Sequence, residues 1–171
     1  MRYAFIDPSG SFNEGKGHTG ISIIDNFNWD TLKTYSLAAK DYTDRHLYWE
    51  DIIMKIVASC CDFVVIESFV VRGNGFLIGK MPETSLFIGA LIWELEQYNI
   101  RYTFQSPSQA KARFKDDYLG MYIPSYEVKE QNGKNYYYLN GKITNDHVRD
   151  SLKHLLYFMK YGSKKICVTE K

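Results

Sequence analysis

The chain has 171 residues, a length that suits one domain with a single core. Its apolar content of 45% and charged content of 24% are ordinary for a soluble globular protein. The net charge of +1 makes no general case for a nucleic-acid partner, although residues 142–171 carry seven Lys or Arg against three acids. No apolar run approaches the ~20 residues of a membrane span, and no signal segment is visible. We therefore expect a soluble protein without a membrane partner.

The cysteines point to a reducing compartment. Cys60, Cys61 and Cys167 are an odd number without metal-ligand spacing. Cys60 and Cys61 fall at the end of a predicted buried helix. We interpret all three as reduced core residues of a cytoplasmic protein.

The N-terminal third predicts an antiparallel meander followed by a helix. Residues 2–7, 19–25 and 31–37 each have the composition and alternation of a strand. Thr43 is a good N-cap, and apolar residues recur after it at helical spacing. These apolar residues are Leu47, Ile52, Ile56 and Val57.

The middle of the chain alternates strands and helices. Residues 62–69, DFVVIESF, form a nearly continuous apolar run, which is typical of a central strand covered on both faces. A glycine-rich loop follows. Pro82 suits the first position of a helix that continues through residues 85–98. Residues 101–105 predict another strand, and residues 106–114 predict a short helix.

The C-terminal part predicts a hairpin and a last helix. Residues 125–142 contain Asn132-Gly133, the strongest short hairpin signal. The helix is capped by Thr144 or Asn145 and closed by Gly162 as its C′ residue. Its apolar positions are Val148, Leu152, Leu155, Leu156 and Met159.

This order of elements predicts an α/β fold. A meander followed by alternating helices and strands indicates a mixed five-stranded sheet with helices on both faces, plus the extra hairpin. The same order is required by an RNase H-like fold. We expect one domain over residues 1–171, with the hairpin as an insertion.

Acidic residues stand at the ends of these elements. Asp7 ends the first strand, and Glu67 ends the buried strand. Asp150 lies one turn into the last helix, with His147 three residues before it on the same face. If the first and fourth strands are neighbours, these side chains meet at one edge of the sheet. Clustered carboxylates bind a cation or take up protons, and their oxygens suit Mg²⁺. Two such ions can hydrolyse a phosphodiester.

Simpler interpretations stay open for each residue. Asp7 can cap the turn before Pro8. Glu67 can pair with Arg72 or Lys80. His147 and Asp150 can be the solvated first turn of a helix, where the dipole favours acids. Asp146 can also point inward and join the site.

Four segments resemble the RuvC family of Holliday-junction resolvases, especially its phage-type members. They are IDPSG with the later TG, DFVVIESF, SPSQAKARF and NDHVRDSL, in the family's order. The resemblance implies a metal-dependent, homodimeric endonuclease that cuts four-way or branched DNA by paired nicks. It implies two Mg²⁺ ions per site, with Mn²⁺ as a substitute, in a bacterial or phage-infected cytoplasm. The implied catalytic residues are Asp7, Glu67, Lys111, His147 and Asp150, and all of these except Lys111 are implied metal ligands.

The resemblance also implies DNA contacts. Phe69 is a candidate wedge at the junction, although a buried structural Phe fits as well. Phosphate contacts of basic residues would make the affinity salt-dependent. The candidates are Arg72, Lys80, Lys111, Arg113, Lys115 and the later Lys153, Lys160, Lys164 and Lys165. The three tyrosines of residues 136–138 can stack on bases, although alternation in a hairpin turns at least one toward the body.

The chain departs from the family in three places. Residues 12–18 lengthen the first turn, Phe69 stands closer to Glu67 than the wedge position requires, and the tyrosine-rich hairpin lacks a counterpart in the bacterial enzymes. Rival hypotheses are another RNase H-fold nuclease, acting on RNA–DNA hybrids or in DNA packaging, and a non-catalytic DNA-binding recombination accessory protein. A sugar-kinase or actin-type ATPase is disfavoured, because the chain is too short for two such domains.

Overall fold

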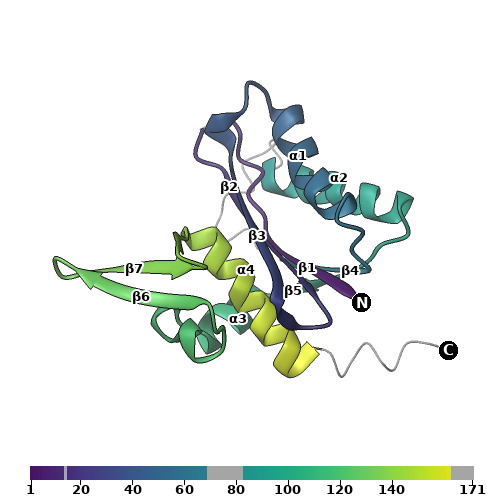
Figure 1. Ribbon diagram of the computed structural model, residues 1–171. Helices are drawn as coiled ribbons and strands as arrows, with labels where there is room; N and C mark the ends of the chain where they lie inside the picture. Colours follow the sequence, from purple (N-terminus) through teal and green to yellow (C-terminus); the bar gives the residue numbers. More distant parts are fainter. Residues whose placement is uncertain (14, 69–82, 163–171) are drawn as a thin grey trace.

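The computed structural model describes residues 1–13, 15–68 and 83–162, which form an α/β fold around a mixed five-stranded sheet (Figure 1). The strand order is β3-β2-β1-β4-β5. The first three strands form the expected antiparallel meander, and β4 and β5 run parallel to β1. The strands are β1 (Arg2–Asp7), β2 (His18–Asp25), β3 (Asn28–Ala38), β4 (Phe63–Glu67) and β5 (Arg101–Gln105). The predicted fold class is confirmed.

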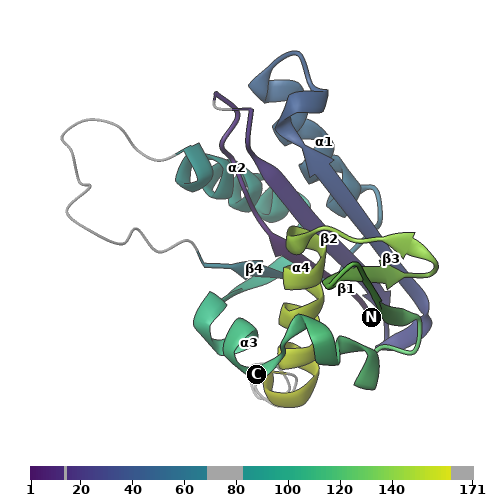
Figure 2. The same ribbon diagram turned by 90° about the vertical axis from the view of Figure 1, so that its left-hand side faces the viewer.

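Helices cover both faces of this sheet (Figures 1 and 2). On one face, α1 (Arg45–Val57) and α2 (Glu83–Gln97) pack on alternate strand residues such as Ile6 and Ile66. On the other face, α4 (Asp146–Tyr157) packs on the intervening residues, such as Phe5 and Val65. The short helix α3 (Pro107–Arg113) lies beside α4. The remaining helical turns are η1 (Ala39–Asp41), η2 (Asp116–Met121) and the π-helical turn η3 (Phe158–Gly162).

The predicted hairpin is confirmed and carries a third strand. Strands β6 (Tyr126–Gln131) and β7 (Lys134–Leu139) turn at Asn132 and Gly133, both with positive φ, and β8 (Lys142–Ile143) pairs with β7. The hairpin projects from the body near the start of α4 (Figure 1). Its base is fixed, because Tyr126 and Leu139 are buried in the α4 layer.

Several local predictions are wrong. The N-cap of α1 is Asp44, whose carboxylate accepts hydrogen bonds from the backbone of His46 and Leu47; it takes the place predicted for Thr43. Leu47 itself is 48% exposed, since the helix turns Tyr48, Ile52 and Ile56 inward instead. Cys60 is exposed and only its neighbour Cys61 is buried, because the chain leaves the helix there.

The predictions for the two ends of the last helix have different outcomes. Asn145 is its N-cap, accepting a hydrogen bond from the backbone N–H of Val148, so this alternative to Thr144 is confirmed. Gly162 is not a left-handed C′ residue, because the chain continues past Tyr157 as the π-helical turn. Pro82 and Cys167 lie outside the described residues. No described helix has the length and apolarity needed to cross a membrane.

Candidate active site

Asp7 and Glu67 lie at neighbouring strand ends. Strands β1 and β4 are parallel, with Ile6 opposite Ile66, so each acid is the next residue of its strand. Because side chains alternate along a strand, both acids turn to the face covered by α4, as Phe5 and Val65 do. Asp7 is 6% exposed. The sequence prediction that strand order would bring these two acids together is confirmed.

A glycine lets α4 reach this edge. Gly20 is paired with Asp7 across β1 and β2, and a Cβ atom there would lie 2.1 Å from the backbone oxygen of His147. Only a residue without a side chain allows the first turn of α4 to rest directly on β2. One turn further, the hydroxyls of Ser22 and Ser151 form a buried hydrogen bond of 2.6 Å. These contacts set the height and rotation of α4 beside the two acids.

His147 contacts Asp7 directly. Its Nδ1 lies 2.7 Å from Asp7 Oδ2 and donates the hydrogen bond. This bond, with the charge of Asp7, raises the pKa of His147 above its usual value. Burial raises the pKa of Asp7, with the nearby charge of Glu67 acting in the same direction, although the hydrogen bond from His147 opposes the shift. The ring of His18, at the start of β2, stacks on the ring of His147, with the two ring centroids 5.8 Å apart.

Lys111 joins Glu67 to Asp150. Its Nζ lies 3.0 Å from Glu67 Oε1 and 2.7 Å from Asp150 Oδ2. Helix α3 follows β5, the neighbour of β4, and thereby places Lys111 over this edge of the sheet. Burial alone would lower the pKa of Lys111, but the charges of Asp7, Glu67 and Asp150 raise it above the usual range. The ammonium group therefore stays charged at neutral pH.

Two buried polar residues, His154 and Gln105, support Glu67 from the core side. The sequence analysis missed both. His154 is fully buried, and its Nε2 lies 2.7 Å from Glu67 Oε2. Its Nδ1 contacts Oε1 of Gln105, the residue paired with Glu67 across β4 and β5. Burial favours the protonated form of Glu67, but His154 and Lys111 outweigh it and lower its pKa to about 2. The signal available was spacing, since His154 lies four and seven residues after Asp150 and His147 on one helix face.

No protein-family model matches the chain, and no curated protein sequence matches it significantly. Solved structures do match. The structure of Thermus thermophilus RuvC in complex with a Holliday junction substrate superposes with a TM-score of 0.62 at 15% identity, covering 98% of this chain and 97% of that one. A second Thermus thermophilus RuvC structure gives 0.58 at 14% identity, covering 95% and 98%. The chain has the fold of RuvC. At this identity the likeness establishes the fold, and the chemistry of the site has to be argued from its residues.

Two of the candidate residues, Asp146 and Lys153, do not lie as predicted. Asp146 points away from the site, because its side chain is 83% exposed and pairs with Arg149. Lys153 is not a free DNA contact, since it is buried and bridges Asp150 and Asp116 at 2.7 and 2.6 Å. Arg113 lies over the Tyr161 ring, and Lys115 is exposed. Phe69, Arg72, Lys80, Lys164 and Lys165 lie outside the described residues.

The donor set suits a hard divalent cation. Glu67 and Asp150 share the Lys111 ammonium group, and Asp7 ends the strand next to that of Glu67. Mg²⁺ prefers carboxylate oxygens of this kind. Burial raises the pKa of Asp7, and a divalent ion would act in the opposite direction by favouring the charged carboxylate. Within the described ranges, no three His, Cys, Asp or Glu side chains are arranged as a metal site. Instead, the carboxylate oxygens contact Lys111, Lys153 and the two imidazoles.

Proposed function

We propose that this chain is a metal-dependent endonuclease that cuts Holliday junctions or related branched DNA by paired nicks. The observation that carries the proposal is the convergence of Asp7, Glu67 and Asp150 with Lys111 at one edge of a RuvC-like sheet. A RuvC of this fold has been solved with a Holliday junction substrate. From the same resemblance we also propose that the chain is similar to the phage-type members and that it acts in the cytoplasm.

Each residue has a distinct part in this proposal. Asp7, Glu67 and Asp150 would hold two Mg²⁺ or Mn²⁺ ions, which when bound activate a water and stabilise the leaving oxygen of a phosphodiester. His147 orients the Asp7 carboxylate through their 2.7 Å hydrogen bond. His154 and Gln105 fix the rotamer of Glu67 from the buried side. Lys111 supplies a positive charge beside the position of the scissile phosphate.

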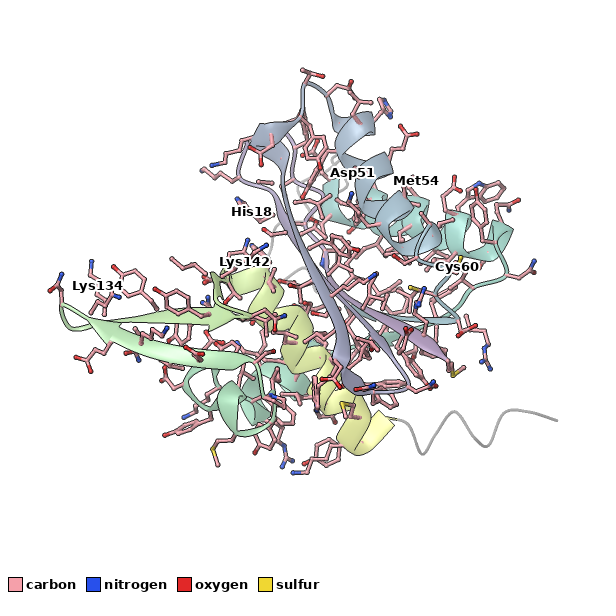
Figure 3. All side chains as sticks on the ribbon, viewed as in Figure 1. His18, Asp51, Met54, Cys60, Lys134 and Lys142 are labelled. Carbon is pink, nitrogen blue, oxygen red and sulfur yellow. The ribbon has the colours of Figure 1, made fainter. Side chains whose placement is uncertain are left out.

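A groove beside the site suits a DNA backbone. It has a volume of about 630 Å³ and runs between the edge strand β3 and the base of the hairpin, ending at Asn145 and Val148 of α4. The described residues that line it include Lys33 and Lys142, and none of them carries a carboxylate. Hydroxyl groups of Thr34 and Ser36 add donors for phosphate oxygens. Figure 3 shows Lys142 near the start of α4 and Lys134 at the hairpin tip.

Two symmetric nicks require two sites, so we propose a homodimer. Helix α2 offers an outer face for this contact, because Leu86 is 42% exposed and Trp93 is 63% exposed on the same side. Sedimentation of the wild-type protein and of Trp93→Arg tests it. The wild type is expected to sediment as a dimer and the variant as a monomer; a monomeric wild type contradicts this part of the proposal.

The cleavage test uses wild-type protein and Asp7→Asn with Mg²⁺ on a labelled four-way junction, a Y-fork, an RNA–DNA hybrid and a linear duplex. We expect symmetric nicks on the junction and a loss of about 100-fold or more in Asp7→Asn, with junction binding retained. Asp30→Asn, an exposed acid on β3, is the matched control and should cut normally. Cutting of the hybrid alone would assign the chain to another class of RNase H-fold nuclease.

One observation favours a second candidate, a non-catalytic DNA-binding accessory protein. Each of the three carboxylates already contacts a basic side chain of the protein, as in a structural ion-pair network. This candidate predicts that the wild type binds junctions without cutting them, and that Asp7→Asn binds equally well.

A further inference from the structure

Lys111 differs from the other basic residues around the carboxylates in its exposure. His154 is fully buried, and the side chain of Lys153 is only 10% exposed and also contacts Asp116. The Lys111 side chain is 35% exposed and reaches the site from the short helix α3. Among the described basic groups that contact Glu67 or Asp150, it is therefore the most exposed and the one whose own charge can move into solvent.

The Lys111 ammonium occupies oxygens that a metal ion would use. One nitrogen contacts both Glu67 Oε1 and Asp150 Oδ2, at 3.0 and 2.7 Å. Mg²⁺ binds carboxylate oxygens at ~2.0–2.1 Å and demands near-octahedral geometry. An ammonium group and a divalent ion bound to the same two oxygens would repel each other strongly at such short separations. The two cations therefore compete for this pair of carboxylates.

Resting on the proposed function, we propose that Lys111 is a resident cation that holds Glu67 and Asp150 together until divalent metal displaces it. Without such a charge, two partly buried carboxylates would repel each other and destabilise the edge of the sheet. A divalent ion would bring two positive charges to the carboxylates in place of the single charge of the ammonium group, and would release the lysine. The four-carbon stem then lets the ammonium turn to the DNA phosphate. Metal binding and the delivery of Lys111 to the substrate become one event.

Calorimetric titration with Mg²⁺, in the absence of DNA, tests this competition. Lys111→Met keeps a similar stem length and removes the charge. We expect it to bind Mg²⁺ about tenfold more tightly than the wild type, since no ion pair has to be broken, which corresponds to ~1.4 kcal/mol. It should also cut more slowly at saturating Mg²⁺. Lys115→Met, an exposed lysine four residues later, should bind Mg²⁺ as the wild type does. Equal or weaker binding by Lys111→Met overturns the proposal.

A second measurement uses the unaltered protein, in case Lys111→Met does not fold. Lysine acylation followed by mass spectrometry reports how free each ammonium group is. Saturating Mg²⁺ should accelerate the modification of Lys111 several-fold and leave that of Lys115 unchanged. Unchanged or slower modification of Lys111, in protein shown to bind Mg²⁺, overturns the proposal.

The two proposals fail differently. If the wild type binds Mg²⁺ and cuts junctions while Lys111→Met binds no more tightly, only the role of Lys111 is wrong. If the wild type neither binds Mg²⁺ or Mn²⁺ nor cuts DNA, the proposed function is wrong and the competition falls with it.

Discussion

Helices α1 and α2 cover one face of the sheet with mainly apolar side chains, whereas α4 covers the other face with buried polar ones as well. The first layer is built around residues such as Ile52, Phe87 and Leu91. In α4, Arg149, Ser151, Lys153 and His154 are buried beside Leu152 and Leu155. Each of these polar side chains has a polar partner on another element. The same sheet is thus stabilised from one face and carries the candidate site on the other.

The largest expected effect tests the stabilising layer. Leu91 of α2 is fully buried, so Leu91→Ala should lower the free energy of unfolding by about 2–5 kcal/mol through lost burial and the cavity that remains. Its junction cleavage per folded molecule should stay near that of the wild type, measured well below its melting temperature. A large loss of specific activity in folded Leu91→Ala would show that this layer also shapes the site.

A second prediction compares a glycine of β2 that contacts α4 with a glycine of α2. Gly20→Ala places a Cβ against the backbone of His147, so α4 has to shift, at a cost of about 1–3 kcal/mol in unfolding free energy. Because the shift moves His147 and Asp150 away from Asp7, the cleavage rate of the folded variant should fall as well, beyond any loss caused by unfolding. Gly89 of α2 is the control, since a Cβ there meets nothing within 4 Å. Gly89→Ala should be neutral or stabilising by up to ~1 kcal/mol. Wild-type cleavage by Gly20→Ala would contradict the close packing inferred for α4.

The apolar layer was also the more predictable one. Periodicity located α1, α2 and the five strands, and the acids at strand ends pointed to Asp7 and Glu67. They were expected to meet if the first and fourth strands were neighbours, and the register of β1 and β4 confirms that condition. The hairpin was predicted because Asn132-Gly133 has a specific backbone requirement.

The polar layer was predicted only in part, for physical reasons. A buried His154 or Lys153 has the same residue type as a solvated one, and only the partner on another element distinguishes them. Hydrophobic patterning does not reveal such partners. For the same reason Lys153 was predicted to contact DNA and Asp146 was kept as a site candidate, while Gln105 and His154 were not considered.

A third prediction tests the buried polar support. His154→Ala leaves Gln105 and one oxygen of Glu67 without this partner, which should cost about 1–3 kcal/mol of unfolding free energy. Cleavage should fall as well, because the Glu67 carboxylate is no longer oriented. His46→Ala, an exposed histidine of α1, should change stability by less than ~0.5 kcal/mol and leave cleavage intact. If His154→Ala is destabilised but cuts at the wild-type rate, His154 supports the core alone.

The smallest expected effect separates the two faces of the hairpin. Tyr137 turns to the body, where its hydroxyl donates to Asp117 and the Arg149 guanidinium lies 4.2 Å from its ring centroid. Tyr136 and Tyr138 flank it and therefore turn to the opposite face, with Lys129 over the Tyr138 ring at 4.8 Å. The exposed Tyr136, with the half-buried Tyr138 and a lysine beside it, is suited to stacking on unpaired bases.

Adjacent tyrosines should therefore respond in opposite ways. Tyr136→Ala should weaken junction binding by roughly 1 kcal/mol, about fivefold, with the melting temperature unchanged, because only a contact to DNA is lost. Tyr137→Ala should lower the melting temperature, since it removes the contacts that hold the hairpin against Arg149 and Asp117. Tyr98→Ala, an exposed tyrosine just after α2, controls for the loss of a surface aromatic. Binding measured by fluorescence anisotropy that is equal for Tyr136→Ala and Tyr98→Ala would confine the hairpin to a structural role, because base stacking requires the outer face and not merely an exposed ring.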